Sequence, residues 1–314
     1  MPRPAARRRF AASGFLVVDK PGGVSSAQVV NHLKRLTGPD RIGHAGTLDP
    51  FATGVLVLCF NQATKLAGYL LDQDKVYQGT MRLGLTTDTQ DLTGQILKRT
   101  PVAVSPEEVQ RAAREFTGVI NQKPPAYSAL KQNGEPLYKK ARRGEKVRTE
   151  SRQVTIHRLE VTRIEPPRVE FEVHCSKGTY IRTLAHDWGL KLGCGGHLEA
   201  LRRIQSGPFV IDQALILGQI EALARQGRLE QRLIPPAKAL DWPGAVVSLQ
   251  AAQKVVQGQS LDSHELQGLP PQSLKVGLHL KLTNQDGQLI ALAKLGVAPQ
   301  GQGLTARPIR VLQV

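Results

Sequence analysis

Apolar residues along the chain fall into runs and alternations that predict strands. Residues 15–18 and 55–60 are uninterrupted apolar runs, which are typical of buried strands. Apolar and polar positions alternate over residues 77–83, which predicts a half-buried strand, and two more strands are expected over residues 154–161 and 169–175. Strands therefore recur through the first half of the chain and beyond it.

Helices are expected between these strands, and each has recognisable end signals. Ser25 and Gln28 have the spacing of a capping box, and an apolar face follows until glycine and proline end the helix at residues 38–39. A second box opens at Ser105 with proline at the first helical position, and a third helix is expected over residues 181–192. Because strands and helices mix without strict βαβ order, the expected fold class is α+β.

Two groups of turn residues indicate where the chain divides. Residues 233–236 and 242–244 are the strongest boundary signals, and beyond them two alternating segments flank a turn that contains Asp286 and Gly287. This pattern predicts a β-hairpin within a small β-rich domain over residues 245–314, after a main domain over residues 14–242. Residues 1–13 carry four arginines and no acidic residue, so we expect a flexible basic tail there.

The segment 41–54 has three glycines and a proline, and its apolar residues follow neither a helical nor a two-residue period. It is therefore expected to be a loop with a defined, irregular conformation. Because a buried strand follows directly, a rigid element presents this loop, as is common for functional loops. Asp49 is its candidate chemical group, and Pro50 restricts its backbone. A nucleophile or base at Asp49 would need a nearby cation, for which Arg182 is a candidate. A turn aspartate that bonds its own backbone remains the alternative.

The charge balance suggests a polyanionic partner. The chain has 42 Lys and Arg against 26 Asp and Glu, a formal net charge of +16, which favours nucleic acid over a merely basic protein. Residues 131–152 contain eight basic and three acidic residues, a local excess of five, and form a candidate nucleic-acid face. Tyr77 and Tyr180 fit either stacking on a base or ordinary core packing.

Several function classes lose support on the sequence alone. Motifs for binding ATP or dinucleotides, for a nucleophile elbow and for a zinc protease are missing from the sequence. The three cysteines are far apart and odd in number, which predicts reduced thiols in a cytoplasmic protein, and Cys194 and His197 offer too few ligands for zinc. The longest apolar run, residues 55–60, is far shorter than the ~20 residues that a membrane span needs.

An ordered set of motifs resembles the bacterial TruB family of tRNA pseudouridine synthases. The stretch GHAGTLDPFATG at residues 43–54 is similar to the family's signature loop. Further matching stretches follow the family's order: DKPGGVSS at 19–26, KVY at 75–77, PPAYSALK at 124–131, SKGTYIR at 176–182 and HLEALRR at 197–203. The resemblance covers roughly residues 14–210.

The resemblance implies a fold and a reaction. The fold is a core with a mixed, mainly antiparallel sheet flanked by helices, followed by a C-terminal RNA-binding domain of PUA-like type. The reaction is the isomerisation of uridine to pseudouridine at position 55, in the T loop of tRNA, without cofactor or metal. Asp49 becomes the carboxylate that starts N-glycosidic bond cleavage, either by attacking the sugar or by assisting a glycal route.

The resemblance also assigns the surroundings of Asp49. Tyr77 stacks on the target base and takes part in moving the C5 proton, and Arg182 pairs with Asp49. Tyr180 and Leu201 line the pocket that holds the flipped base.

Other residues are assigned to RNA contact or support by the same resemblance. His44 fills the space that the uridine leaves in the T-loop stack, and Lys20 is a structural or pocket-edge residue and takes no part in the chemistry. A basic insertion at about residues 123–152 grips the RNA. The expected RNA-binding residues are Lys131, Lys139, Lys140, Arg142, Arg143, Arg202 and Arg203.

Three other functions stay open at this point. They are an RNA-binding protein or tRNA chaperone without catalysis, a guide-RNA-dependent synthase of the Cbf5 type, and a metabolic enzyme with a small acidic substrate, which fits the charge but none of the motifs. Asp49, Tyr77 and Arg182 are all present, which argues against the first. The bacterial-type insertion argues against the second. We therefore expect a monomer that needs tRNA but no protein partner.

Overall fold

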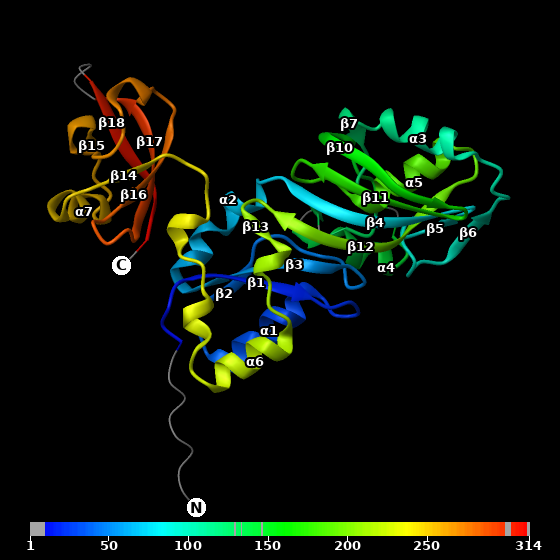
Figure 1. Ribbon diagram of the computed structural model, residues 1–314, viewed down its shortest axis with the longest axis horizontal. Helices are drawn as coiled ribbons and strands as arrows, with labels where there is room; N and C mark the ends of the chain where they lie inside the picture. The colour runs from blue at the N-terminus through cyan, green and yellow to red at the C-terminus, as the bar shows by residue number, and fades with distance from the viewer. Residues whose placement is uncertain (1–9, 129, 133, 146, 299–302, 313–314) are drawn as a thin grey trace, which may run out of the picture.

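A large mixed sheet forms the centre of the protein, seen here in a computed structural model that describes residues 10–128, 130–132, 134–145, 147–298 and 303–312 (Figure 1). Its strand order is β1-β3-β12-β4-β11-β10-β7, with β2 beside β3 and β13 beside β12. The strands are β1 (Gly14–Lys20), β2 (Ile42–His44), β3 (Thr53–Phe60), β4 (Lys75–Leu83), β7 (Gly118–Gln122), β10 (Arg152–Glu165), β11 (Arg168–Cys175), β12 (Gly196–Ser206) and β13 (Phe209–Val210). Only β3 and β12 pair in parallel among these strands, which confirms the expected mixed, mainly antiparallel sheet.

Helices cover the two ends of this sheet, as Figure 1 shows. The helices of the core are α1 (Ser26–Thr37), α2 (Ala67–Leu71), α3 (Pro106–Arg114), α5 (Ile181–Lys191) and α6 (Leu217–Arg225). Short 3-10 turns lie at Asn61–Leu66, Ile211–Gln213, Leu229–Arg232 and Pro236–Lys238. Both expected capping boxes are confirmed, because Ser25 and Ser105 each accept a backbone N–H three residues on.

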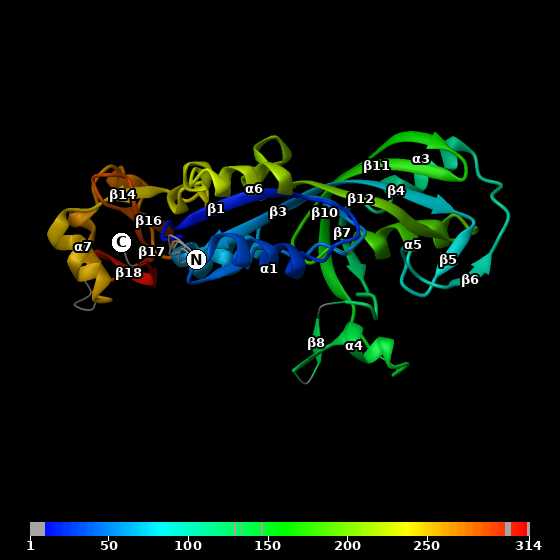
Figure 2. The same ribbon diagram turned by 90° about the horizontal axis from the view of Figure 1, so that it is seen from below.

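Two small segments lie outside the large sheet. One is a ribbon of β5 (Leu85–Thr87) and β6 (Ile96–Arg99). The other is the expected insertion between β7 and β10, which contains β8 (Lys131–Gln132), β9 (Glu135–Pro136) and α4 (Leu137–Arg142) and projects away from the sheet (Figure 2).

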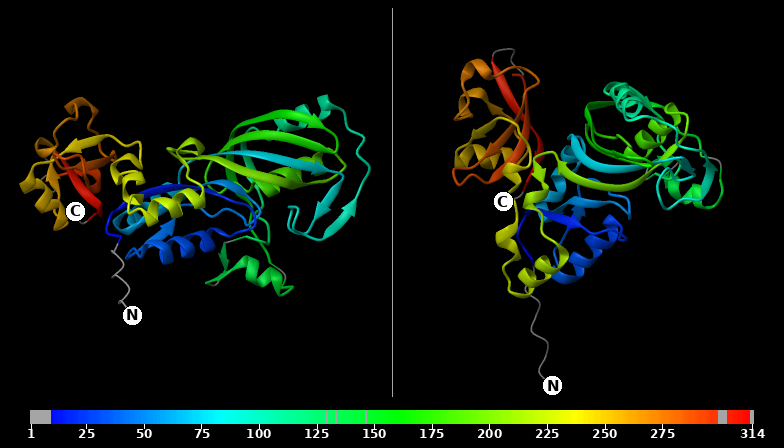
Figure 3. Two further views of the ribbon diagram at one scale, coloured as in Figure 1. Left: turned by 60° about the horizontal axis from the view of Figure 1, so that its bottom comes forward. Right: turned by 45° about the vertical axis from the view of Figure 1, so that its right-hand side comes forward.

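A second sheet at the C-terminal end contains the predicted β-hairpin (Figure 3). Its order is β14-β16-β17-β18-β15, with one helix, α7, beside it. The elements are β14 (Gly244–Val246), α7 (Leu249–Val256), β15 (Leu261–Asp262), β16 (His279–Thr283), β17 (Leu289–Val297) and β18 (Leu304–Val311), with 3-10 turns at Ser263–Glu265 and Pro271–Ser273. Leu289, Leu292 and Leu312 share one apolar cluster with Phe15 and Leu66, so this sheet packs on the core.

Two expectations about local structure were wrong. Phe10 does not belong to a flexible tail: it is buried, its ring lies 5.0 Å from that of Phe60, and Asn61 donates to its carbonyl. The tail arginines at residues 3 and 7–9 lie outside the described residues. The segment 41–54 is not loop throughout, because Ile42–His44 pairs with β3. Within the described ranges, no helix is long and apolar enough to cross a membrane.

Candidate active site

Asp49 lies on a loop between β2 and β3 that several contacts hold in place. The Ser26 hydroxyl accepts the backbone N–H of Leu48 at 2.9 Å and lies 3.2 Å from the carbonyl of Leu48. The backbone N–H of Gly23 donates to the carbonyl of Pro50 at 2.8 Å. These contacts tie the loop to the start of α1, so the backbone on both sides of Asp49 is held in place.

The structure brings Arg182 to Asp49, which the sequence could only suggest. Nε of Arg182 lies 2.9 Å from Oδ2 of Asp49, and Nη2 donates to Oδ1 at 3.2 Å. Arg182 comes from the first turn of α5, and its side chain is only 5% exposed. The same guanidinium donates to the backbone carbonyls of Tyr127, at 2.9 Å, and Thr89, at 3.2 Å. A buried, five-donor cation is thereby held in one orientation beside the carboxylate.

Asp91 is a second acid on Arg182, and the sequence analysis missed it. Its Oδ2 lies 3.4 Å from Nη1 of Arg182. Its Oδ1 accepts the hydroxyl and backbone N–H of Thr93, at 2.6 and 2.9 Å, and the hydroxyl of Thr89 at 2.8 Å. Asp91 is buried, although it lies in a polar segment with no periodicity that would predict burial. Arg182 therefore bridges two carboxylates.

Burial raises the pKa of Asp49 above its usual range. The Arg182 guanidinium opposes that shift, the Asp91 carboxylate adds to it, and Lys20 opposes it weakly. The carboxylate is thus less solvated than a surface aspartate, and a desolvated carboxylate is a stronger base and nucleophile than a hydrated one.

A cavity of about 320 Å³ opens over Asp49 and Arg182. Tyr77 on β4, Tyr180 before α5 and Leu201 on β12 all line this cavity. Its size suits one nucleotide base, at the lower end of the range for small-molecule sites. Burial raises the pKa of the Tyr77 hydroxyl, so this side chain stays a neutral, flat wall at physiological pH.

Lys20 and His44 lie near the cavity but do not line it. Nζ of Lys20 donates to the carbonyls of Pro21, Val24 and Pro50, at 2.8, 2.7 and 3.2 Å, and ties β1 to the Asp49 loop. Burial lowers the pKa of Lys20 to about 8. His44 ends β2, just before the loop, and its Nδ1 is buried without a hydrogen-bond partner among the described residues.

Arg203 does not belong with the exposed basic residues. It is 1% exposed, and its guanidinium donates to the carbonyls of Val55 and Gly46 at 2.7 and 3.0 Å. Arg203 lines the cavity, and its hydrogen bond to Gly46 supports the Asp49 loop; the parallel pairing of β12 with β3 brings it there. Its neighbour Arg202 is part-exposed and pairs with Asp19 through two hydrogen bonds of 3.0 and 2.8 Å.

The insertion places most of its basic residues on the surface. Lys139, Arg142 and Arg143 are exposed, and Lys140 is partly exposed. Arg143 is paired with Glu135 and Glu145. Lys131 begins β8, and Lys146 lies outside the described residues.

Possible metal ligands gather elsewhere in the part of the chain that the structure describes. Two groups of three lie there, Asp74 with His157 and His174, and Asp262 with His264 and Glu265. Neither group touches the Asp49 cavity.

Known proteins match this arrangement over most of the chain. A family model described as TruB family pseudouridylate synthase (N terminal domain) matches residues 34–181, and one described as tRNA pseudouridylate synthase B C-terminal domain matches residues 182–241. The chain belongs to the TruB family of pseudouridine synthases. Its TruB relatives include tRNA pseudouridine synthase B of Pseudomonas aeruginosa, 44% identical over 92% of this chain and 94% of that protein. The protein of the same name from Stutzerimonas stutzeri is 42% identical over 97% and 98%.

Solved structures with the same fold extend the comparison beyond the bacterial TruB proteins. A structure described as an H/ACA RNP bound to a substrate RNA containing 2'-deoxyuridine has a TM-score of 0.74 and 25% identity, over 96% of this chain and 85% of that chain. A Cbf5-Nop10-Gar1 complex gives a TM-score of 0.73 and 27% identity, over 96% and 84%. The expected pseudouridine synthase core is confirmed.

Proposed function

We propose that this protein converts uridine at position 55, in the T loop of tRNA, to pseudouridine, and that Asp49 starts the reaction. The observation that carries the proposal is the contact of Asp49 with the buried Arg182 at one side of a base-sized cavity. Membership of the TruB family supports the reaction, and relatives named tRNA pseudouridine synthase B support the substrate.

The chemistry needs an ionised carboxylate and a closed pocket. The bond between N1 and C1′ breaks, the uracil turns, and a bond between C5 and C1′ forms while C5 loses its proton. Asp49 starts this sequence by attacking the sugar or by assisting a glycal route, and Arg182 holds it in place and balances its charge. Tyr77, Tyr180 and Leu201 keep the detached uracil in the cavity. Cofactor and metal have no part in the proposal.

The insertion is proposed to grip the T arm and to connect the RNA to the site. Its basic residues, with Lys131, Lys139, Lys140, Arg142 and Arg143, would neutralise phosphates. Its first part also reaches the chemistry, because the carbonyl of Tyr127 accepts from Arg182 and Leu130 lines the cavity. RNA bound by the insertion would thus be connected to Asp49 through Tyr127 and Arg182.

The remaining roles concern the flipped base. His44, with its unpartnered Nδ1, would fill the space that the uridine leaves. Arg202 would contact the RNA backbone near the cavity, Lys20 would stabilise the Asp49 loop, and the C-terminal sheet, proposed to be PUA-like, would bind RNA. We place the protein in the cytoplasm as a monomer that needs no protein partner.

The test is tritium release from C5-labelled uridine in an unmodified tRNA transcript, with the purified protein alone. Release that persists in excess chelator and stops when uridine 55 is replaced by cytidine is expected. Tight binding without release would overturn the proposal in favour of a tRNA chaperone. Release that requires a guide RNA would move the protein to the guide-dependent class.

A further inference from the structure

A second group of chemically active side chains lies on the opposite face of the large sheet from Asp49. Successive residues of a strand point to opposite faces. Tyr77 and Cys175 line the Asp49 cavity, whereas their neighbours Val76 and His174 line a separate cavity of about 800 Å³. Asp74, directly before β4, also lines this second cavity. The proposed reaction does not use the side chains of Asp74, Val76 or His174.

Asp74, His157 and His174 converge there. Nε2 of His157 lies 3.1 Å from Oδ2 of Asp74, and Nε2 of His174 lies 3.7 Å from the same oxygen. The two imidazole rings are 4.7 Å apart, and all three ligand atoms lie within 4.8 Å of one another.

An irregularity in β10 brings His157 and His174 together at Asp74. The pairing of β10 with β11 shifts between Ile156 and Arg158, so that His157 is an extra residue opposite His174. A β-bulge re-aims the side chain of its extra residue, here toward the same face as His174. A regular ladder would place neighbouring side chains on opposite faces, so the bulge is what brings both imidazoles to one carboxylate.

We propose that Asp74, His157 and His174 bind one divalent transition ion of the zinc type. Zinc–nitrogen and zinc–oxygen bonds of about 2.0–2.2 Å separate the ligands of a tetrahedral site by roughly 3.3 Å, which the observed spacing approaches. Two imidazoles and one carboxylate are ligands that zinc favours, whereas magnesium and calcium prefer oxygen alone. The three side chains are 37, 41 and 48% exposed for His157, His174 and Asp74, so the ion can enter and water can complete its coordination.

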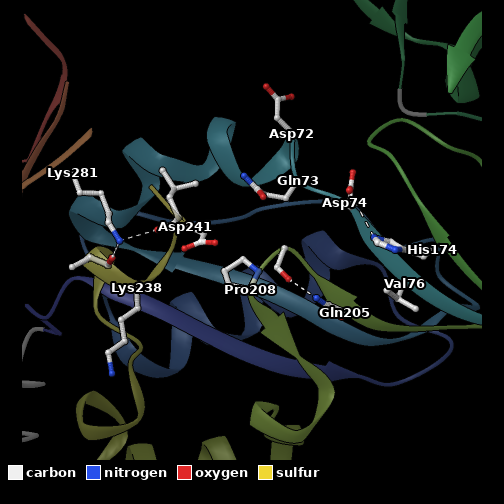
Figure 4. A pocket seen from close by; sticks show the side chains of 13 residues that line it. Asp72, Gln73, Asp74, Val76, His174, Gln205, Pro208, Lys238, Asp241 and Lys281 are labelled. Carbon is white, nitrogen blue, oxygen red and sulfur yellow. Dashed lines mark hydrogen bonds and ion pairs between the residues drawn. The ribbon is translucent and has the colours of Figure 1, made fainter. Parts of the chain in front are cut away.

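The position of the site gives the ion a structural consequence. Figure 4 shows Asp74 and His174 at one end of the cavity, with Lys238 and Lys281 at the other end. Nζ of Lys281 donates to the carbonyls of Ala237 and Leu240, in the segment that leads to the C-terminal sheet. An ion would join β10, β11 and the start of β4 beside this connection and would stabilise the folded chain by mass action.

The other group of possible ligands is a poorer site. Asp262, His264 and Glu265 supply one imidazole, and Glu265 already accepts from Lys254 at 2.9 Å and from the backbone of Asp262 at 3.0 Å. Its carboxylate is therefore engaged in holding a 3-10 turn.

The experiment uses the full chain without an affinity tag, freed of metal by chelator, and titrates it with Zn²⁺ and with Mg²⁺ by calorimetry. One Zn²⁺ per chain at micromolar concentration, a higher Tm and no Mg²⁺ binding at this affinity are expected. His157→Gln and His174→Gln should each weaken Zn²⁺ binding at least about tenfold. The matched control is His32→Gln, since that exposed imidazole also lies 2.9 Å from a carboxylate, on Glu221, and its loss should change nothing.

Zinc binding that is equally strong in His157→Gln and the wild type would overturn the proposal, as would less than one ion bound per two chains. A second readout needs no variant: Co²⁺ in place of Zn²⁺ should give tetrahedral visible bands without thiolate charge transfer. Thiolate bands would show that cysteines hold the ion, and would overturn the assignment as well.

Discussion

Replacing Asp49 with asparagine separates chemistry from folding and binding more cleanly than any other change in the site. The amide keeps the shape of the side chain and removes its charge. Arg182 retains its contacts to the carbonyls of Tyr127 and Thr89, at 2.9 and 3.2 Å, and its 3.4 Å ion pair with Asp91. The buried guanidinium is therefore still neutralised in the variant.

The expected effect of Asp49→Asn on stability is small, because two contributions oppose each other. Charge-assisted hydrogen bonds are worth about 1.5–3 kcal/mol, which the variant partly loses. Against this, burial raises the pKa of Asp49, so the folded state disfavours the ionised carboxylate. For an acid whose pKa is raised by folding, its stabilising contribution is full below the unfolded pKa and falls as the pH rises through the folded pKa. The side chain of Asp49 is 35% exposed, so solvent weakens both opposing contributions. We expect the free energy of unfolding to change by no more than about 1 kcal/mol.

The expected effect on rate is large, because the variant lacks the carboxylate that we propose starts bond cleavage. Asp49→Asn should lower single-turnover tritium release by at least about 10⁴-fold. Its Kd for tRNA, measured by fluorescence anisotropy, should stay within about threefold of the wild type. Asp212→Asn, on an exposed 3-10 turn, is the matched control. An Asp49→Asn protein that keeps more than about one hundredth of the wild-type rate, or that loses binding and turnover together, would refute the reasoning.

Three further expectations test other parts of the structure. Since the pKa of Asp49 is raised, kcat/KM should fall in acid with a midpoint above the ordinary value of about 3.9. A midpoint at or below that value would contradict the raised pKa. Gly54→Ala should lower the free energy of unfolding in urea by about 3 kcal/mol. The φ of Gly54 is +95°, and an added Cβ would lie 2.2 Å from a backbone oxygen of β12. The control Gly43→Ala should be nearly neutral, because a Cβ there would have no neighbouring atom within 4 Å. Lys139→Ala should weaken tRNA binding, lower the slope of log Kd against log salt concentration by about one unit, and leave kcat unchanged. Arg143→Ala should weaken tRNA binding less, because the Arg143 guanidinium is already paired with Glu135 and Glu145.

Arg182 connects parts of the chain that have separate tasks. It contacts Asp49 on the signature loop, Asp91 after β5, and Tyr127 at the start of the insertion. A single guanidinium thus relates the position of the insertion to that of the Asp49 carboxylate. Lysine could keep the charge but could not span three partners, since it lacks the planar fork of donors.

Local patterns in the sequence determined much of this protein. The alternation over residues 77–83, the capping boxes at Ser25 and Ser105, and the hairpin around Gly287 all depend on neighbours within a few residues, so they could be predicted. The motif around Asp49 identified the family for the same reason, because its residues are consecutive.

Only the tertiary structure decided which distant groups meet. The Asp49–Arg182 contact joins residues 133 positions apart, and the burial of Asp91 and Arg203 depends on how loops and β12 close around them. The bulge that turns His157 toward His174 likewise arises from pairing between strands. Sequence periodicity reports which face of an element is apolar, whereas the energy of a buried charge depends on partners that long-range folding supplies.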